Sequence, residues 1–426
     1  MKFCRRGSLI DLEKICKNAK RSAFEVSVLS NGKRNIILKD IADSIKRETK
    51  HILKANEADL RKSRNLQSEL KDRLVLDEFK LKDIANSIKN IISLEDPLLA
   101  KERYTRDDGL IIVKQSIPVG VIAAIYESRP NVTADISCLA IKSGNVAILR
   151  GGKESLGTNL ALLKIIQNSL RKNGVSPNAI QYVRDPDRRH INRLLEMADY
   201  IDLVIPRGGK KLVNMVSEKA KMKAIFGGIG VCHLYIDEKV EEKIVIPIIE
   251  NSKTQAPSVC NALDTILIHE KQVKNLLPEI LNHLIKIGVE VRLQSKLFKH
   301  YKKSTSSKLI KNATENDWGQ EFLGLTVSIK SVPSITKAIE HIEDYSYSHT
   351  DAIASNIKKN QKLFVERVNS TAVMINASTR FNDGGQLGLG AEIAISTEKL
   401  SPRGPLGLNE ITTYKWVIKG EGHIRS

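Results

Sequence analysis

Cys260 is the first residue with a chemistry of its own to consider, because a polar turn precedes it and an apolar run follows. The segment 254–262 reads Thr-Gln-Ala-Pro-Ser-Val-Cys-Asn-Ala and leads into an expected strand at 263–268 that is mostly apolar. A thiol reacts as a thiolate, so a catalytic cysteine needs nearby cations or backbone N–H donors. For any single cysteine, this one included, the sequence alone favours a buried and inert residue. Cys232 and His233 are adjacent on an expected strand and so point to opposite faces, which makes a thiol–imidazole pair improbable.

Three glycine pairs directly follow short apolar runs, and they suggest a phosphate site: Gly151–Gly152, Gly208–Gly209 and Gly227–Gly228. Basic residues flank the first two pairs: Arg150, Lys153, Arg207 and Lys210. Turns at strand ends bind phosphates in open α/β sheets, through backbone N–H groups and positive charge. One such pair alone would indicate an ordinary loop, whereas three favour a dinucleotide site. Neither Gly-x-Gly-x-x-Gly nor a P-loop motif is present, so the site would be a variant one.

Two further segments gather polar groups after an apolar run. In residues 126–133, Arg129 and Asn131 could donate to an oxyanion, a phosphate or a carboxylate. The structural alternative is a helix start capped by Asn131 or Thr133, and both interpretations can hold together. In residues 376–392, which are rich in small and polar types, Arg380 is the natural clamp for a carboxylate.

The elements that must position these residues follow from hydrophobic periodicity. Residues 11–99 show helical spacing, and Pro97 supplies the signal that stops the helices. Residues 109–117 resemble one arm of a hairpin with its bend at 107–109. From Pro118, short apolar runs alternate with helical stretches, which predicts βαβ units and a parallel sheet. A second such unit begins near Leu234, and residues 411–418 form a final strand that could pair outside its own domain.

Length and composition limit the class of protein. The chain has 426 residues, of which 41% are hydrophobic and 27% charged, so a globular protein of two or three domains is expected. No apolar run approaches the roughly 20 residues that span a bilayer. The N-terminal residues lack the apolar stretch of a secretory signal, so we expect a cytoplasmic protein without a membrane partner.

Charge and cysteine usage exclude other classes. The formal net charge is +19, from 68 basic and 49 acidic residues, yet the lysines are scattered among acids and only 4% of residues are aromatic. This pattern argues against nucleic acid as the partner and favours a solvated lysine-rich surface. The five cysteines form no Cys-x-x-Cys pair, so neither a disulfide framework nor a metal site is expected.

Taken in order, these segments resemble the gamma-glutamyl phosphate reductases, a family of the aldehyde dehydrogenase superfamily. The matching motifs lie at residues 117–122, 125–135, 142–152, 205–209, 257–262, 376–381, 388–392 and 403–408. They cover essentially the whole chain. The resemblance implies an aldehyde dehydrogenase-like α/β fold with two parallel-sheet domains and a small oligomerisation arm. The expected division is a helical lead-in at 1–104, the arm at 105–117, a dinucleotide-binding domain at 118–233, a catalytic domain at 234–398 and an oligomerisation strand at 399–426.

The resemblance also implies a reaction, the second step of proline biosynthesis from glutamate. The Cys260 thiolate attacks the acyl carbon of L-glutamate 5-phosphate and expels phosphate, and NADPH then reduces the thioester to L-glutamate 5-semialdehyde. The implied substrate and oxyanion residues are Arg129, Asn131, Asn261, Asn376 and Arg380. The implied cofactor residues are Arg150, Gly151, Gly152, Lys153, Ser155, Pro206, Arg207, Gly208, Gly209 and Glu321. A homo-oligomer is expected, and direct transfer from the upstream glutamate kinase stays open.

Several positions depart from the family pattern or discriminate within the superfamily. Phe226 stands where hydrolytic aldehyde dehydrogenases carry a glutamate base, which agrees with phosphate rather than water as the acyl partner. Ala256 replaces an expected Arg and Gly324 an expected Asp, and a missing Arg near the thiol could slow the reaction. Three alternatives remain. The first is a reductase for a related acyl phosphate or semialdehyde, and the second is a noncatalytic relative, suggested by Ala256 and Gly324. The third is a basic nucleic-acid-binding protein, suggested by the net charge of +19.

Overall fold

The computed structural model describes residues 11–64, 71, 73–302, 307–390 and 392–425. It divides into two compact units. Unit 1 comprises Met1–Gly227, Gly388–Ala394 and Leu406–Ser426, and unit 2 comprises Gly228–Leu387 and Ile395–Pro405. The α/β class with parallel sheets predicted from the sequence is confirmed.

Unit 1 begins with the helices that the periodicity predicts. They are α1 (Leu12–Ser27), α2 (Asn31–Arg47), α3 (Thr49–Lys62) and α5 (Glu78–Ser93). Side-chain oxygens of Asp11, Ser30 and Asp77 cap three of these helices by accepting backbone N–H bonds. The apolar stripe of α2, which includes Ile37 and Ile41, is buried in the core of the unit.

The core of unit 1 is a parallel five-stranded sheet in the order β5-β4-β3-β6-β7. Its strands are β3 (Val121–Tyr126), β4 (Val146–Arg150), β5 (Ile180–Tyr182), β6 (Leu203–Arg207) and β7 (Lys223–Ala224). The connecting helices are α6 (Pro130–Lys142), α7 (Leu156–Lys172), α8 (Arg189–Leu195) and α9 (Lys210–Lys219). The chain runs outward from β3 to β5 and then returns to β6 on the other side of β3. Ligands bind at the carboxyl ends of strands where the order reverses in this way, so the ends of β3 and β6 mark the expected site.

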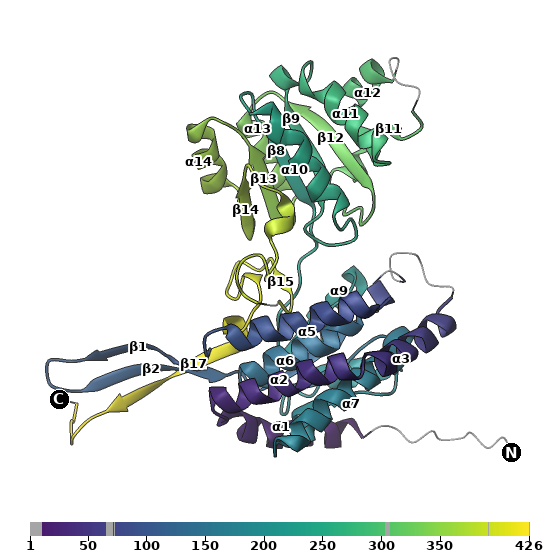
Figure 1. Cartoon of the computed structure of the whole chain (residues 1–426). Helices are drawn as coiled ribbons and strands as arrows, with labels where there is room; N and C mark the ends of the chain where they lie inside the picture. The colour runs from purple at the N-terminus through teal and green to yellow at the C-terminus, as the bar shows by residue number, and fades with distance from the viewer. Residues whose placement is uncertain (1–10, 65–70, 72, 303–306, 391, 426) are drawn as a thin grey trace. The chain divides into compact units, whose positions relative to one another are not determined.

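A three-stranded antiparallel arm extends from unit 1, with order β1-β2-β17 (Figure 1). It consists of β1 (Ala100–Thr105), β2 (Ile111–Pro118) and β17 (Thr412–Lys419). The predicted hairpin and the C-terminal strand are both confirmed, because β17 pairs with β2 along its whole length. Tyr414, Trp416 and Ile418 are at least half exposed on β17.

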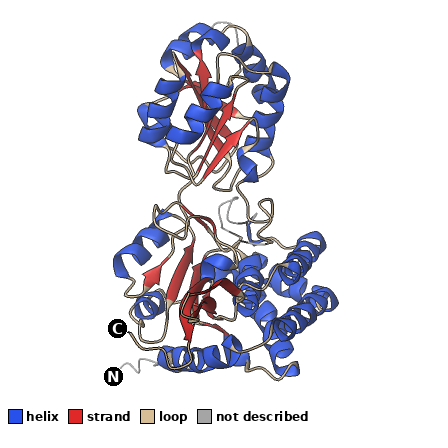
Figure 2. Ribbon diagram, turned by 90° about the vertical axis from the view of Figure 1, so that its left-hand side faces the viewer, coloured by secondary structure: helices blue, strands red, loops and turns tan. Residues whose placement is uncertain are grey.

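Unit 2 is built on a seven-stranded parallel sheet with order β11-β10-β12-β9-β8-β13-β14. The strands are β8 (Cys232–Ile236), β9 (Leu263–His269), β10 (Glu290–Leu293), β11 (Ile310–Asn312), β12 (Thr326–Val332), β13 (Thr350–Ala354) and β14 (Ala372–Ile375). Helices cover both faces of the sheet (Figure 2): α10 (Glu242–Thr254), α11 (Leu276–Lys286), α12 (Ser295–Tyr301), α13 (Ile335–Tyr345) and α14 (Lys358–Arg367). The sequence analysis missed β11 and β13. In β13, Asp351 interrupts the apolar pattern, and its carboxylate accepts from the His233 N–H inside the unit.

The unit boundaries differ from the predicted domain edges. The expected edge between residues 233 and 234 would cut β8, whereas the whole strand pairs with β9 and β13 inside unit 2. The predicted edge at 398–399 is also displaced, because residues 388–394 return to unit 1, where Ile393 and Leu406 join its core. In the described part of the chain, no helix is long and apolar enough to cross a membrane.

Candidate active site

Cys260 lies in unit 2, in the turn that joins α10 to β9. It is half-buried, while Cys16, Cys138 and Cys232 are fully buried. Burial raises the pKa of Cys16 to about 12, and it raises the pKa values of Cys138 and Cys232 strongly as well. Among the cysteines of the described residues, Cys260 is therefore the one whose thiol can meet a substrate.

The backbone beneath Cys260 is fixed by close contacts. The Cys232 thiol lies 3.2 Å from the carbonyl oxygen of Cys260 and donates to it. Gly230 packs so closely that a Cβ there would lie 1.6 Å from the same oxygen. The Gly230 N–H donates to Glu321 at 3.3 Å, so the residue expected to bind a ribose lies in unit 2 and supports the Cys260 turn.

Asn261 and Arg380, two of the predicted substrate residues, lie together beside this turn. Arg380 donates from Nη1 to the side-chain oxygen of Asn261 and from Nε to Gln255 at 2.7 Å. The Asn261 amide donates to the Asn382 carbonyl at 2.9 Å, and Thr379 Oγ1 donates to the Asn261 carbonyl at 2.7 Å. The guanidinium is thus held in a fixed orientation, and no described residue accepts from its Nη2. That group could bind an anionic oxygen of a substrate.

Asn376 has a different environment. Its side chain accepts from the Ser355 N–H at 2.8 Å and donates to the Ser355 carbonyl at 3.0 Å. Its backbone φ is +52°, a left-handed conformation that asparagine tolerates better than most residues. The structure therefore uses this side chain to hold the ends of β13 and β14 rather than aiming it at Cys260.

A buried ion pair below the Cys260 turn was missed by the sequence analysis. Lys253 Nζ lies 3.5 Å from Asp264 Oδ1, and both side chains are almost completely buried. Asp264 also accepts from the Phe322 N–H at 3.1 Å. Burial raises the pKa of Asp264 to about 6, against the opposing effect of Lys253, and lowers the pKa of Lys253. The only signal in the sequence was an acid within the first residues of an apolar strand.

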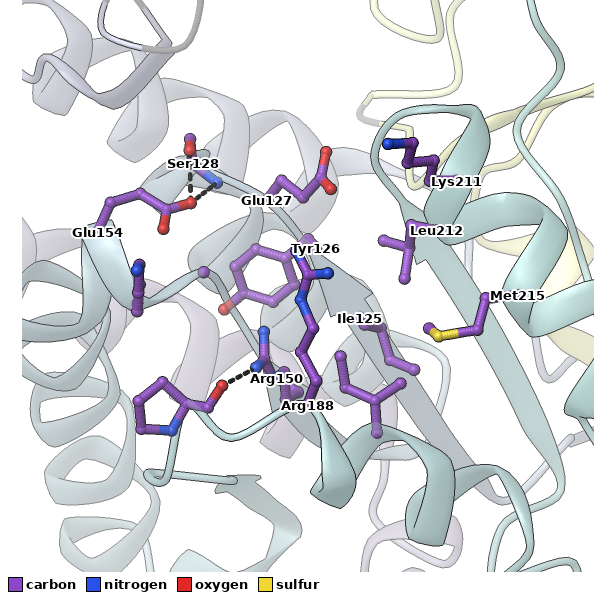
Figure 3. Close-up of a pocket in the computed structure, with 14 residues that line it drawn as sticks. Ile125, Tyr126, Glu127, Ser128, Arg150, Glu154, Arg188, Lys211, Leu212 and Met215 are labelled. Carbon is purple, nitrogen blue, oxygen red and sulfur yellow. Dashed lines mark hydrogen bonds between the residues drawn. The ribbon is translucent and has the colours of Figure 1, made fainter. Parts of the chain in front are cut away.

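A separate cavity lies in unit 1, at the carboxyl ends of β3, β4 and β6 (Figure 3). Its volume is about 610 Å³. It is lined by Ile125, Tyr126, Glu127, Ser128, Arg150, Gly152, Lys153, Glu154, Pro186, Arg188, Ile191, Lys211, Leu212 and Met215. Its place at the reversal of strand order and its size are those of a nucleotide pocket.

The cations around this cavity divide into fixed and free. The Arg150 guanidinium donates to the carbonyls of Gly151 at 3.1 Å and Pro186 at 2.5 Å. The residue is only 8% exposed, so it forms part of the cavity wall. Lys153, Arg188 and Lys211 are exposed, and their side chains form no ion pair with a described residue. Sequence analysis proposed Lys153 and missed the other two, although Arg188 belongs to a basic-acidic run at 184–189 directly after β5.

The glycine pairs also have distinct roles. The Gly151 N–H donates to the Tyr182 hydroxyl at 3.1 Å, and a Cβ at Gly151 would lie 2.4 Å from the Asn159 amide. The expectation that a free N–H faces an anion therefore does not hold at Gly151. Ser155 is buried and donates to the Gly152 carbonyl at 3.3 Å, so it shapes the same turn. Gly208 and Gly209 are exposed after β6 at the start of α9, and the Gly209 N–H donates to Glu127 Oε2 at 3.0 Å.

The remaining predicted residues of unit 1 lie in β6 and at the start of α6, and they are not among the residues that line this cavity. Pro206 is buried in β6 and Arg207 ends that strand half-buried. Arg129 is the N-terminal cap residue of α6, and Asn131 in the first turn donates to Asp135 at 3.0 Å. Burial raises the pKa of Asp135 to about 6. The predicted cap at Asn131 or Thr133 is wrong, because the helix already begins at Pro130 and its N-cap residue, Arg129, makes no side-chain capping hydrogen bond.

Comparison with known proteins first gives the class. The model of the aldehyde dehydrogenase family matches residues 3–299. An acetylating aldehyde dehydrogenase from Geobacillus thermoglucosidasius has the same fold, with a TM-score of 0.73 at 15% identity over 97% of both chains. This chain therefore belongs to the aldehyde dehydrogenase family, whose members use nicotinamide cofactors and act on small-molecule substrates.

Closer relatives narrow the class to one family. Gamma-glutamyl phosphate reductase from Vibrio vulnificus is 41% identical, over 96% of this chain and 98% of that protein. The protein of the same name from Caldanaerobacter subterraneus is 42% identical over 98% of this chain and all of its own. The crystal structure of gamma-glutamyl phosphate reductase from Thermotoga maritima superimposes with a TM-score of 0.92 at 38% identity, covering 97% of this chain and 100% of that chain. This chain belongs to the gamma-glutamyl phosphate reductase family.

Proposed function

We propose that this protein reduces L-glutamate 5-phosphate to L-glutamate 5-semialdehyde and phosphate with NADPH, as a step of proline biosynthesis. The observation that carries the proposal is the accessible Cys260, held between Gly230 and the Asn261–Arg380 pair. Near-full-length similarity to the gamma-glutamyl phosphate reductases supports it. No cluster of metal-ligating side chains occurs among the described residues, and the proposed chemistry requires none.

The proposed reaction assigns one task to each group. The Cys260 thiolate forms a bond to the acyl carbon as the bond from that carbon to the phosphate oxygen breaks, which releases phosphate and leaves a thioester. NADPH, when bound, supplies the hydride that reduces the thioester carbonyl, and the carbon–sulfur bond then breaks to give the aldehyde and regenerate the thiolate. Arg380, fixed by Asn261 and Gln255, offers Nη2 to the amino-acid carboxylate of the substrate.

The choice of NADPH over NADH rests on the free cations of the unit 1 cavity. A 2′-phosphate adds negative charge to the ribose, and Lys153, Arg188 and Lys211 provide exposed positive charge along the cavity wall. Arg150 supports the wall instead, because its donors already serve the Gly151 and Pro186 carbonyls. These residues fit an anionic dinucleotide. Among the three exposed cations we assign the 2′-phosphate to Arg188, since a guanidinium group can bind a phosphate with two donors.

The reverse reaction provides the test. Purified protein should reduce NADP with glutamate 5-semialdehyde only when phosphate or arsenate is present. Cys260→Ala should abolish this activity, while Cys138→Ala, at a fully buried thiol, serves as the matched control that retains it. Phosphate-independent activity would indicate a hydrolytic aldehyde dehydrogenase. A lack of activity with NADP still binding would exclude the proposed reaction and direct attention to Ala256.

We further propose that the arm β1-β2-β17 mediates homo-oligomerisation. Strand β17 forms one edge of the arm and exposes Tyr414, Trp416 and Ile418, which gives an apolar strip beside unpaired backbone groups. An edge of this kind is stabilised by pairing with another chain. Strand β1, the opposite edge, carries the half-exposed Tyr104.

A further inference from the structure

Glu127 lines the cavity of unit 1 and accepts a hydrogen bond from the backbone at the start of α9. It follows directly after β3, and its Oε2 accepts from the Gly209 N–H at 3.0 Å. The carboxylate also packs on Gly208, where an added Cβ would lie 2.7 Å from the Glu127 Cδ. Glu127 lines the cavity of unit 1 together with Lys211 and Leu212 of α9, as Figure 3 shows.

The donor that Glu127 occupies is one that an anionic ligand would use. Gly209 is the N-terminal cap of α9, a helix of 10 residues, and lacks a side chain that could cap it. Such helix starts attract anions through free N–H groups and the helix dipole. Gly208 and Gly209 are exposed, so a ligand in the cavity can reach this backbone. A carboxylate and a phosphate oxygen are the same kind of acceptor, and two anions cannot share one N–H without repulsion.

We propose that Glu127 is a built-in competitor for a phosphate group of the dinucleotide, so that it must leave the Gly209 N–H before the cofactor binds fully. This inference rests on the proposed function, because it assumes that the unit 1 cavity receives NADPH. The cavity offers the displaced carboxylate other partners, since Lys211 and Arg188 line it and carry no ion pair with a described residue. Apparent affinity then equals the intrinsic affinity reduced by the fraction of molecules whose Gly209 N–H is open.

The Glu127→Gln variant tests the proposal with little change in shape. A neutral amide oxygen holds the Gly209 N–H more weakly than a carboxylate does. We expect the Kd values for NADPH and NADH to fall together, by about three- to ten-fold, which corresponds to an open fraction of roughly 10–30% in the native protein. Stopped-flow binding should show the gain in the association rate. The preference between the two cofactors should not change, because both carry the same pyrophosphate.

Glu154→Gln is the matched control. Glu154 lines the same cavity, but its carboxylate accepts from the N–H and hydroxyl of Ser128, at 3.3 and 2.6 Å, rather than from Gly209. A smaller effect of this variant supports competition at Gly209, whereas equal tightening by both variants would show general charge repulsion and overturn the proposal. Weaker or unchanged binding in Glu127→Gln would also overturn it. If the native protein binds neither cofactor, the proposed cofactor role fails, and this inference fails with it.

Discussion

The buried pair Lys253–Asp264 gives the sharpest prediction about the support of the Cys260 turn. The variants are Asp264→Asn, Lys253→Met and the double variant. Both groups are nearly inaccessible to solvent, and Asp264 accepts from the N–H of Phe322 as well as facing Lys253. Removing one partner leaves the other buried without compensation, whereas removing both leaves no buried charge.

The expected magnitudes follow from burial. Each single variant should lose about 3–5 kcal/mol of unfolding free energy, and the double variant should lose clearly less than the sum of the two.

The two tryptophans make the assay specific to one unit. Trp318 is buried in unit 2, and Trp416 is half exposed on β17 of unit 1. In a Trp416→Phe background, fluorescence during urea unfolding reports unit 2 alone, which matters because a protein of two units need not unfold in one step. The reasoning is refuted if the effects of the single variants add in the double variant. A loss below about 1 kcal/mol in Asp264→Asn at pH 7 would equally refute it.

Four further predictions concern the Cys260 turn, the cavity of unit 1 and the arm. Gly230→Ala should abolish turnover while far-UV circular dichroism stays native, because a Cβ would lie 1.6 Å from the Cys260 carbonyl; retained turnover would contradict the fixed position of that turn. In a Cys4→Ser background, iodoacetamide should alkylate Cys260 first, as peptide mass spectrometry can verify, since the other described thiols are buried. Arg188→Gln should raise the Kd of NADPH at least ten-fold and that of NADH less than two-fold in titration calorimetry, and equal changes would exclude a 2′-phosphate contact. Trp416→Lys should dissociate the oligomer, as measured by light scattering, without altering the unfolding of the subunit. An unchanged molecular mass of the assembly would show that the arm does not mediate oligomerisation.

Much of the fold was accessible from the sequence because its signals are local. Short apolar runs between helical stretches predicted β3, β4, β5 and β6, and turn residues predicted the hairpin of the arm. One of the strands that were missed, β13, carries Asp351, whose buried carboxylate is satisfied by the His233 N–H and by the hydroxyls of Ser346 and Ser370. A pattern along one segment cannot reveal a partner that is 118 residues away.

The same distinction separates the site residues. The order of the motifs along the chain identified the family, because such motifs can be read from a linear sequence, and the resemblance then implied Cys260 as the nucleophile. Only tertiary contacts decided that Arg150 supports a wall while Arg188 faces the cavity, and that Glu127 holds the Gly209 N–H. The physical reason is that a charged side chain has the same chemistry wherever it occurs, whereas burial and the competing hydrogen bonds around it determine which ligand it can still bind.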